Sequence, residues 1–262
     1  MKIIPKKSLG QNFLIDKNII NKISNTCALS SDDNVLEIGP GTGNLTEAIL
    51  NKNPKSFFVI EKDIGLSENL KKRFIDKLKV INDDILKYDL NSIKKKNLII
   101  FGNLPYNISS QILAKIINFS ENKFSFKKLI FMFQKEVADR IIAKDNTKHY
   151  GRLSIFSSWK LNINKIMDIH PSSFYPKPKV MSTLLEFIPK TNFIKFKNSK
   201  NLEHITNVFF NQRRKMIKKP LKVLFNNPIE VAEELNLNLN LRPQNLKKET
   251  YFKICSIYEK FI

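Results

Sequence analysis

Cysteine and histidine are scarce in this sequence of 262 residues. The two cysteines, Cys27 and Cys255, are too few and too far apart for a disulfide framework or a zinc site. The three histidines, His149, His170 and His204, lack the spacing of metal ligands. No apolar run approaches the roughly 20 residues that cross a bilayer, and the N-terminal MKIIPKKSLG is not followed by the apolar core of an export signal. The sequence therefore predicts a cytoplasmic protein that binds no metal and no membrane.

Acidic residues are also few relative to basic ones. The sequence has 24 Asp and Glu against 45 Lys and Arg, a formal net charge of +21. A charge of this size favours a polyanionic partner such as nucleic acid. The sequence is also rich in Lys, Asn and Ile, which is typical of an AT-rich genome. The positive charge by itself therefore does not distinguish a nucleic-acid partner from a bias in genome composition. With 42% hydrophobic residues, extended disorder is excluded.

Strand-like apolar runs alternate with helical patterns over residues 34–190. This alternation predicts a mostly parallel sheet covered by helices on both faces, which is an α/β fold. Ligands of such sheets bind at the carboxyl ends of the strands. The expected strands are residues 35–38, 57–60, 79–81, 98–101, 129–133, 163–169 and 184–188.

The pattern changes after residue 190. Residues 191–262 carry 14 basic and 6 acidic side chains and contain helical patterns at 202–219 and 228–235, but no strand pattern. We therefore predict two domains, an α/β domain over residues 1–190 and a small basic helical domain over residues 191–262. Pro220 falls just after the first of these helical patterns, where proline ends or kinks a helix.

A glycine-rich turn follows the first expected strand. Gly39, Gly41 and Gly43 form the pattern G-x-G-x-G, in which glycine lets the backbone approach a ligand closely and exposes N–H groups at a helix start. Such a turn alone is weak evidence, since it also serves as a plain strand-to-helix connection. Glu61 ends the second expected strand 22 residues after Gly39, the place for a carboxylate that binds ribose hydroxyls.

The spacing of this turn distinguishes between nucleoside cofactors. It is not the G-x-G-x-x-G that seats a pyrophosphate, which disfavours NAD and FAD. Glu37 before the turn and an aspartate after the third strand, either Asp83 or Asp84, suit a cationic ligand without phosphate. These features predict S-adenosylmethionine as the cofactor, with a carboxylate accepting from the adenine amino group.

The fourth expected strand ends in the sequence N-L-P-Y. Pro105 has no N–H and holds Leu104 extended, so that the Leu104 carbonyl is free to accept. Asn103 adds a side-chain acceptor, and Tyr106 adds an aromatic face. Two acceptors for the hydrogens of an adenine N6 would favour a pyramidal nitrogen with its lone pair directed at an electrophilic methyl group. The motif predicts methylation of an exocyclic amine, with Asn103, Leu104, Pro105 and Tyr106 as its catalytic residues.

Six segments, one of which contains N-L-P-Y, occur in the order found in one family. The whole chain resembles the bacterial small-subunit ribosomal RNA adenine dimethyltransferases. The turn at residues 37–43 is shared by many methyltransferases, whereas the N-L-P-Y, F-x-P-x-P-K-V and F-N-Q-R-R-K segments together are selective. The matching segments are residues 8–14 (S-L-G-Q-N-F-L), 101–106, 133–137 (F-Q-K-E-V), 150–154 (Y-G-R-L-S), 174–180 (F-Y-P-K-P-K-V) and 210–215 (F-N-Q-R-R-K).

The resemblance implies a Rossmann-like, seven-stranded methyltransferase domain and a smaller helical domain. It implies dimethylation of two adjacent adenosines near the 3′ end of 16S rRNA, by a monomer acting on the 30S subunit. It also implies that Phe174 covers the target base, although a rigid loop connector remains an alternative for this residue, and it favours Asp84 over Asp83. The residues that would contact S-adenosylmethionine are Asn12, Leu14, Gly39, Glu61, Asp84 and Asn103.

Three other functions remain as alternatives. A 23S rRNA methyltransferase would share the fold, but the segment at residues 210–215 argues against it. A DNA adenine methyltransferase would more often carry D-P-P-Y and a target-recognition insertion. A ribosome-assembly factor that needs no catalysis is the alternative from a different functional class. The basic face at Arg214 and Lys218 is interpreted either as solvated or as a phosphate-contacting surface.

Overall fold

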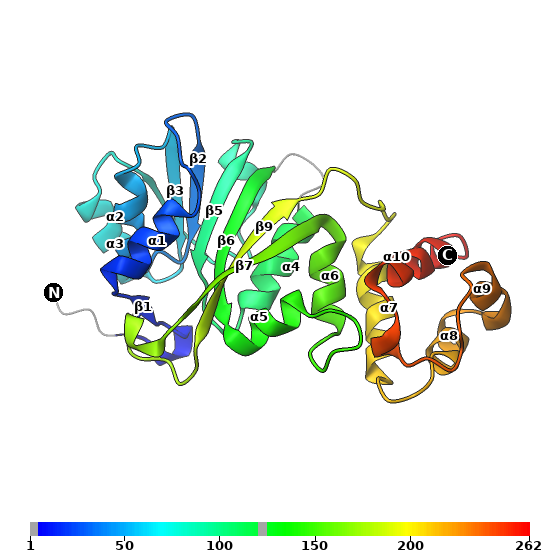
Figure 1. Ribbon diagram of the computed structural model, residues 1–262. Helices are drawn as coiled ribbons and strands as arrows, with labels where there is room; N and C mark the ends of the chain where they lie inside the picture. The colour runs from blue at the N-terminus through cyan, green and yellow to red at the C-terminus, as the bar shows by residue number, and fades with distance from the viewer. Residues whose placement is uncertain (1–4, 120–124) are drawn as a thin grey trace. The chain divides into compact units, whose positions relative to one another are not determined.

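The computed structural model describes residues 5–119 and 125–262 (Figure 1). The chain forms two compact units, Met1–Ala138 with Ile163–Pro189 and Asp139–Asn162 with Lys190–Ile262. The sequence predicts a single division at residue 190, whereas the structure also assigns residues 139–162 to the second unit. The physical reason is helix α6 (Arg152–Lys160), whose largely buried side chains pack against α7 (Ser199–Asn211) and α10 (Lys248–Tyr258).

A sheet with the strand order β4-β3-β2-β5-β6-β9-β7 forms the centre of the fold. Each of the seven expected runs lies in one of its strands, which confirms the predicted α/β fold. Strands β4, β3, β2, β5 and β6 are parallel, and β9 runs antiparallel to β6. The bounds are β2 Asn34–Ile38, β3 Ser56–Glu61, β4 Lys79–Asn82, β5 Leu98–Asn103, β6 Phe126–Gln134, β7 Leu161–Ile169 and β9 Ser182–Pro189.

Helices cover both faces of this sheet. Helices α1 (Lys17–Asn25) and α2 (Asn44–Leu50) lie on one side in Figure 1 and α4 (Ser109–Phe119) on the other. The central strands are buried on both sides, so their sequences are mostly apolar rather than alternating, although β2 contains the buried Glu37. The remaining helices of this part of the chain are α3 (Ile64–Arg73) and α5 (Lys135–Ile142).

The parallel register brings together segments that are distant in sequence. Ile38 at the end of β2 pairs with Ile60 of β3 and with Gly102 of β5. The residues that follow these strands therefore emerge at the same edge of the sheet. The glycine turn, Glu61 and the Asn103–Tyr106 segment all start at this edge.

The second unit is helical, as predicted, but its helices have different bounds. Helix α7 ends at Asn211, and residues 212–217 form a turn before α8 (Lys218–Leu224), so the prediction of one helix over 202–219 is wrong. Pro220 lies in the first turn of α8, where a missing N–H removes no helical hydrogen bond. Helix α9 (Pro228–Glu234) follows it.

Buried tyrosines organise the core of the second unit. The hydroxyl of Tyr150 donates to the Leu246 carbonyl at 2.9 Å, and that of Tyr251 donates to the Pro243 carbonyl at 2.6 Å. The rings of Tyr251 and Phe209 meet edge to face, with centroids 5.3 Å apart. Each hydroxyl has a partner, so the polar tips of these rings are buried without an unsatisfied donor.

Within the described residues, no helix is long and apolar enough to span a bilayer. The same part of the chain contains no group of three His, Cys, Asp or Glu side chains arranged to hold a metal ion.

Candidate active site

A cavity lies at the carboxyl edge of the sheet. It is lined by the N-terminal segment from Ser8 to Leu14, the glycine turn, the end of β3, and the loops after β4 and β5. Nine of the ten residues singled out from the sequence line it. These are Asn12, Leu14, Gly39, Glu61, Asp84, Asn103, Leu104, Pro105 and Tyr106.

The glycine turn lines the cavity. The Gly39 N–H donates to the Ile60 carbonyl at 2.9 Å, which ties the turn to the end of β3. Gly39, Gly41 and Gly43 all have positive φ, which a residue with a Cβ adopts only with strain. A Cβ on Gly41 would also lie 2.8 Å from the Phe13 ring. The turn therefore requires glycine for both its conformation and its packing.

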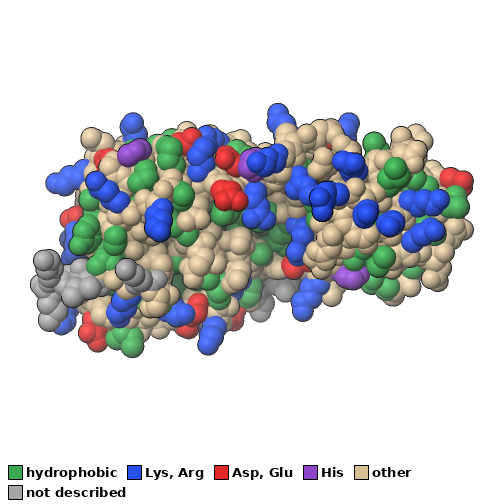
Figure 2. All heavy atoms as spheres, turned by 90° about the horizontal axis from the view of Figure 1, so that it is seen from below, with side chains coloured by type: hydrophobic (Ala, Val, Ile, Leu, Met, Phe, Trp, Pro, Cys, Tyr) green, Lys and Arg blue, Asp and Glu red, His purple; other side chains and the backbone are tan. Residues whose placement is uncertain are grey.

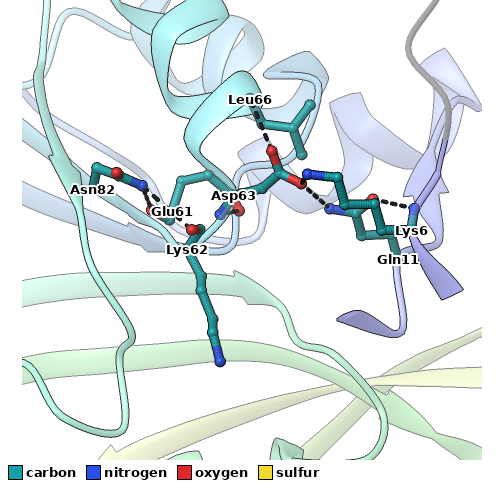
Figure 3. Close-up of polar contacts among 7 residues, drawn as sticks. All are labelled: Lys6, Gln11, Glu61, Lys62, Asp63, Leu66 and Asn82. Atoms are coloured by element: carbon teal, nitrogen blue, oxygen red, sulfur yellow. Dashed lines mark hydrogen bonds and ion pairs between the residues drawn. The ribbon is translucent and has the colours of Figure 1, made fainter. Parts of the chain in front are cut away.

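Glu61 presents a buried carboxylate to the cavity. Only 6% of the residue is exposed. Its Oε2 accepts from the Gly41 N–H at 3.1 Å. Its Oε1 accepts from the Asp63 N–H at 2.9 Å (Figure 3). Burial raises the pKa of the Glu61 carboxyl, and the two backbone donors oppose that rise. The group is thus held in one orientation beside the glycine turn.

Asp84 and Asp83 follow β4, and they differ in what their carboxylates bind. Asp83 is exposed and accepts from the Asp84 N–H at 2.6 Å. Asp84 accepts from the Leu86 N–H at 2.9 Å and pairs with the Lys62 ammonium at 2.9 Å. Lys62 is the main cause that lowers the pKa of Asp84. Both aspartates line the cavity, and Asp84 is the more enclosed of the two.

Backbone carbonyls tie the N-terminal segment to the cavity. The Asn103 Nδ2 donates to the Asn12 carbonyl at 2.9 Å, and the Asn44 Nδ2 donates to the Leu14 carbonyl at 2.8 Å. Leu14 and Phe13 form the short strand β1 (Phe13–Leu14). The segment thus forms one wall of the cavity and orients the side chain of Asn103.

Asp63 anchors the same segment from outside the cavity. Its Oδ2 pairs with the Lys6 ammonium at 2.8 Å and accepts from the Gln11 Nε2 at 3.3 Å (Figure 3). Its Oδ1 accepts from the Leu66 N–H and so caps helix α3. Burial alone would raise the pKa of Asp63, but the hydrogen bonds from Lys6, Leu66 and Gln11 outweigh it and lower that pKa.

The Asn103–Tyr106 segment forms a turn before helix α4. The Ile108 N–H donates to the Pro105 carbonyl at 3.1 Å, and the Ser109 hydroxyl donates to the Tyr106 carbonyl at 3.2 Å. The Leu104 carbonyl takes part in neither bond. Because the Nδ2 of Asn103 is bound to Asn12, its Oδ1 is the atom that remains as an acceptor. The turn therefore carries two acceptors and an aromatic ring at the cavity.

Phe174 does not line the cavity in this structure, whereas the sequence places it over the target base. It belongs to the two-residue strand β8 (Phe174–Tyr175), in which it pairs with Leu14 of β1. It is 1% exposed and packs in the apolar cluster that includes Ile23 and Phe101. Side chains alternate along a strand, so Phe174 points into the core and Tyr175 is exposed. In this structure Phe174 is a packing residue.

Comparison with known proteins places the chain in a family. The model of the ribosomal RNA adenine dimethylase family matches residues 5–260. The chain belongs to this family. It is 56% identical over 255 residues to ribosomal RNA small subunit methyltransferase A of Pelagibacter ubique (strain HTCC1062), covering 97% of each chain. Its identity to the protein of the same name from Ehrlichia canis (strain Jake) is 43% over 260 residues, again covering 97% of each.

Solved structures agree in fold. A dimethyladenosine transferase from Plasmodium falciparum superposes with a TM-score of 0.82 at 29% identity, covering 95% of this chain and 98% of that one. The 23S rRNA methyltransferase ErmE superposes with a TM-score of 0.69 at 20% identity, covering 95% and 99%. This second likeness is evidence for the Rossmann-like fold only.

Several residues of this adenine dimethylase site were not predicted from the sequence. Lys62 and Asp63 organise the carboxylates and the N-terminal wall, but isolated charged residues carry no motif. Gln11 also holds this wall, and it lies in the 8–14 segment, from which no role was predicted for it. Ser182 is another such residue, since its hydroxyl lies 2.7 Å from that of Tyr106. The position of Lys62 and Asp63 directly after Glu61 was the one available signal, because residues at strand ends face this edge.

The Glu37 side chain of this family member is buried. It is 2% exposed, and its Oε2 accepts from the Thr46 hydroxyl at 2.7 Å. Burial raises the pKa of Glu37 to about 8, against an ordinary value of 4.5. The expectation of an anionic Glu37 is therefore not met near neutral pH, where the neutral form predominates.

Replacing Glu37 with glutamine should change how stability depends on pH. Between about pH 4.5 and 8 the folded chain keeps the Glu37 proton and the unfolded chain releases it, so stability falls as pH rises through this window. The E37Q variant has no such loss. As pH rises through the window, we expect the free energy of unfolding of E37Q minus that of the wild type to increase by roughly 1 kcal/mol per pH unit. Urea unfolding at several pH values measures this, with the exposed Glu68→Gln as control. A difference that does not vary with pH would contradict the burial of an uncharged Glu37.

Proposed function

We propose that this chain transfers methyl groups from S-adenosylmethionine to the N6 atoms of two adjacent adenosines near the 3′ end of 16S rRNA, within the small ribosomal subunit. Its family membership and the small-subunit names of its bacterial relatives support this proposal. The observation that carries it is the Asn103 amide, held by the Asn12 carbonyl with its Oδ1 left as an acceptor at the cavity. The compartment remains the prediction made from the sequence, which is the cytoplasm.

The residues of the cavity suit S-adenosylmethionine. A Cβ on Gly39 would meet only the Asn103 carbonyl, at 3.7 Å, so the glycine leaves space that a ligand can fill. Glu61 would accept from two ribose hydroxyls, and Asp84 from the adenine amino group. Asn12 and Leu14 would close the cavity from the N-terminal side. When bound, the cofactor supplies an electrophilic methyl group on a sulfonium.

The Asn103–Tyr106 turn would orient the target adenine. The Asn103 Oδ1 and the Leu104 carbonyl accept the two N6 hydrogens, which favours a pyramidal nitrogen with its lone pair directed at the methyl group. Tyr106 stacks on the base, an interaction that typically contributes about 1–3 kcal/mol. Catalysis in this scheme rests on positioning. The methylated nitrogen is acidic and loses its proton readily, so no strong general base is required.

A basic surface on the second unit would bind the RNA backbone. The exposed cations at the turn before α8 and in α8 include Arg214, Lys215, Lys218 and Lys219. Figure 2 shows many Lys and Arg side chains over the part formed by α7–α10. Structured RNA is bound mostly through its shape and its phosphates, which such a surface suits.

Removing charge from this surface should reduce the salt dependence of binding. For Arg214→Gln combined with Lys218→Gln, we expect the slope of log affinity against log salt to decrease by about 2, one for each lost phosphate contact. Filter binding to 30S subunits at several salt concentrations measures the slope. Lys71→Gln with Lys72→Gln on α3 removes the same charge elsewhere and should leave the slope unchanged. Equal slopes for the two pairs would exclude the proposed surface.

Nucleoside mass spectrometry tests the proposed function directly. Under-methylated 30S subunits are incubated with the protein and labelled S-adenosylmethionine, beside a 50S control. We expect N6,N6-dimethyladenosine in fragments from the 3′ end of 16S rRNA and no label in 23S rRNA. Label in 23S rRNA would instead support the large-subunit alternative, and binding to 30S without methylation would support the assembly-factor alternative.

A further inference from the structure

The hydroxyls of Tyr106 and Ser182 meet although they are 76 residues apart. Their oxygens lie 2.7 Å apart, and either group can donate. Ser182 is the first residue of β9 and pairs with Gln134 at the end of β6. It is fully buried, at 0% exposed. A serine on a paired strand in the interior has little freedom to move, so its hydroxyl is a rigid partner for the phenol.

Tyr106 is held at its backbone as well as at its hydroxyl. The Ser109 hydroxyl donates to its carbonyl at 3.2 Å. Burial raises the pKa of the phenol, which keeps the hydroxyl protonated. Since Phe174 is in the core, Tyr106 and Phe13 are the aromatic residues among those that line the cavity. Phe13 packs against the glycine turn, which leaves Tyr106 as the ring available to a base.

We infer that Ser182 is a positioning residue that sets the plane of the Tyr106 ring for the target adenine. Ser182 does not line the cavity and acts only through the Tyr106 hydroxyl. The inference rests on the proposed role of Tyr106 in stacking. Through this bond, the strand that follows the 174–180 segment controls the geometry of the turn after β5.

A double-mutant cycle tests this coupling. Ser182→Ala, Tyr106→Phe and the double variant are assayed for methylation of under-methylated 30S subunits, and S-adenosylhomocysteine affinity is measured by calorimetry. We expect each single variant to lose about 3- to 10-fold in kcat, the scale of one neutral hydrogen bond. Affinity for S-adenosylhomocysteine should stay within 2-fold. The double variant should match Y106F, because the removed interaction is the same.

Ser67→Ala is the matched control. Ser67 is also buried, at 1% exposed, and its hydroxyl has no hydrogen-bond partner in the part of the chain that the structure describes. It should therefore keep the wild-type kcat. An S182A variant with wild-type kcat, or one that loses the same factor in the Y106F background, would overturn the inference. A Y106F variant with wild-type kcat would overturn it as well, because phenylalanine keeps the ring and loses only the hydroxyl bond to Ser182. If Tyr106→Ala, which removes the ring, keeps full kcat while the wild type is active, the stacking role of Tyr106 fails instead. If the wild type does not methylate 30S subunits, the proposed function fails.

Discussion

Asn103→Ala should reduce kcat for methylation of 30S subunits by at least 100-fold. The substitution removes the Oδ1 acceptor that the Asn12 carbonyl holds in place through Nδ2 at 2.9 Å. Loss of one preorganised polar group at a reacting centre typically costs about 10²–10³ in kcat. Binding of S-adenosylhomocysteine should weaken by less than 10-fold, since Glu61 and the glycine turn are untouched. Single-turnover methylation and calorimetry measure the two quantities separately.

Asn21→Ala is the control for this substitution. Asn21 is exposed on helix α1, so removal of its amide should leave both quantities unchanged. An Asn103→Ala variant with wild-type kcat would refute the proposed mechanism. Survival of 30S binding in the same variant would show that subunit recognition is separable from methyl transfer.

Glu61→Ala should lower the affinity for S-adenosylhomocysteine by about 100-fold or more. The Glu61 carboxylate would bind two ribose hydroxyls, and hydrogen bonds to a charged group contribute about 1.5–3 kcal/mol each. The variant also leaves the N–H groups of Gly41 and Asp63 without their acceptor, so the glycine turn loses its support. Calorimetric titration with S-adenosylhomocysteine gives the affinity directly.

A matched change at Glu68 separates this effect from general loss of charge. Glu68 is exposed on α3, and Glu68→Ala should bind as the wild type does. Thermal unfolding of Glu61→Ala without ligand checks that the fold persists. A folded Glu61→Ala variant with undiminished affinity would place the ribose elsewhere in the cavity.

The sequence by itself determined the sheet and the main features of the site. Apolar runs such as residues 57–60 and 98–101 could be assigned because strands buried on both faces are apolar along most of their length. The glycine turn and Glu61 could be placed at one edge because parallel strands end together. Proline after Leu104 has only local consequences, so the N-L-P-Y turn was also predictable.

Only the tertiary structure decided which groups meet across long distances in the chain. The bond between Asn103 and Asn12 joins residues 91 positions apart, and that between Tyr106 and Ser182 spans 76. Phe174 belongs to the 174–180 motif, but the sequence there shows no strand pattern. Its burial follows from the pairing of β8 with β1. Glu37 was predicted as a carboxylate that suits a cationic ligand, and only the structure showed that it is buried. Local sequence determines which conformations a segment can adopt, whereas burial and partners depend on what the rest of the chain brings against it.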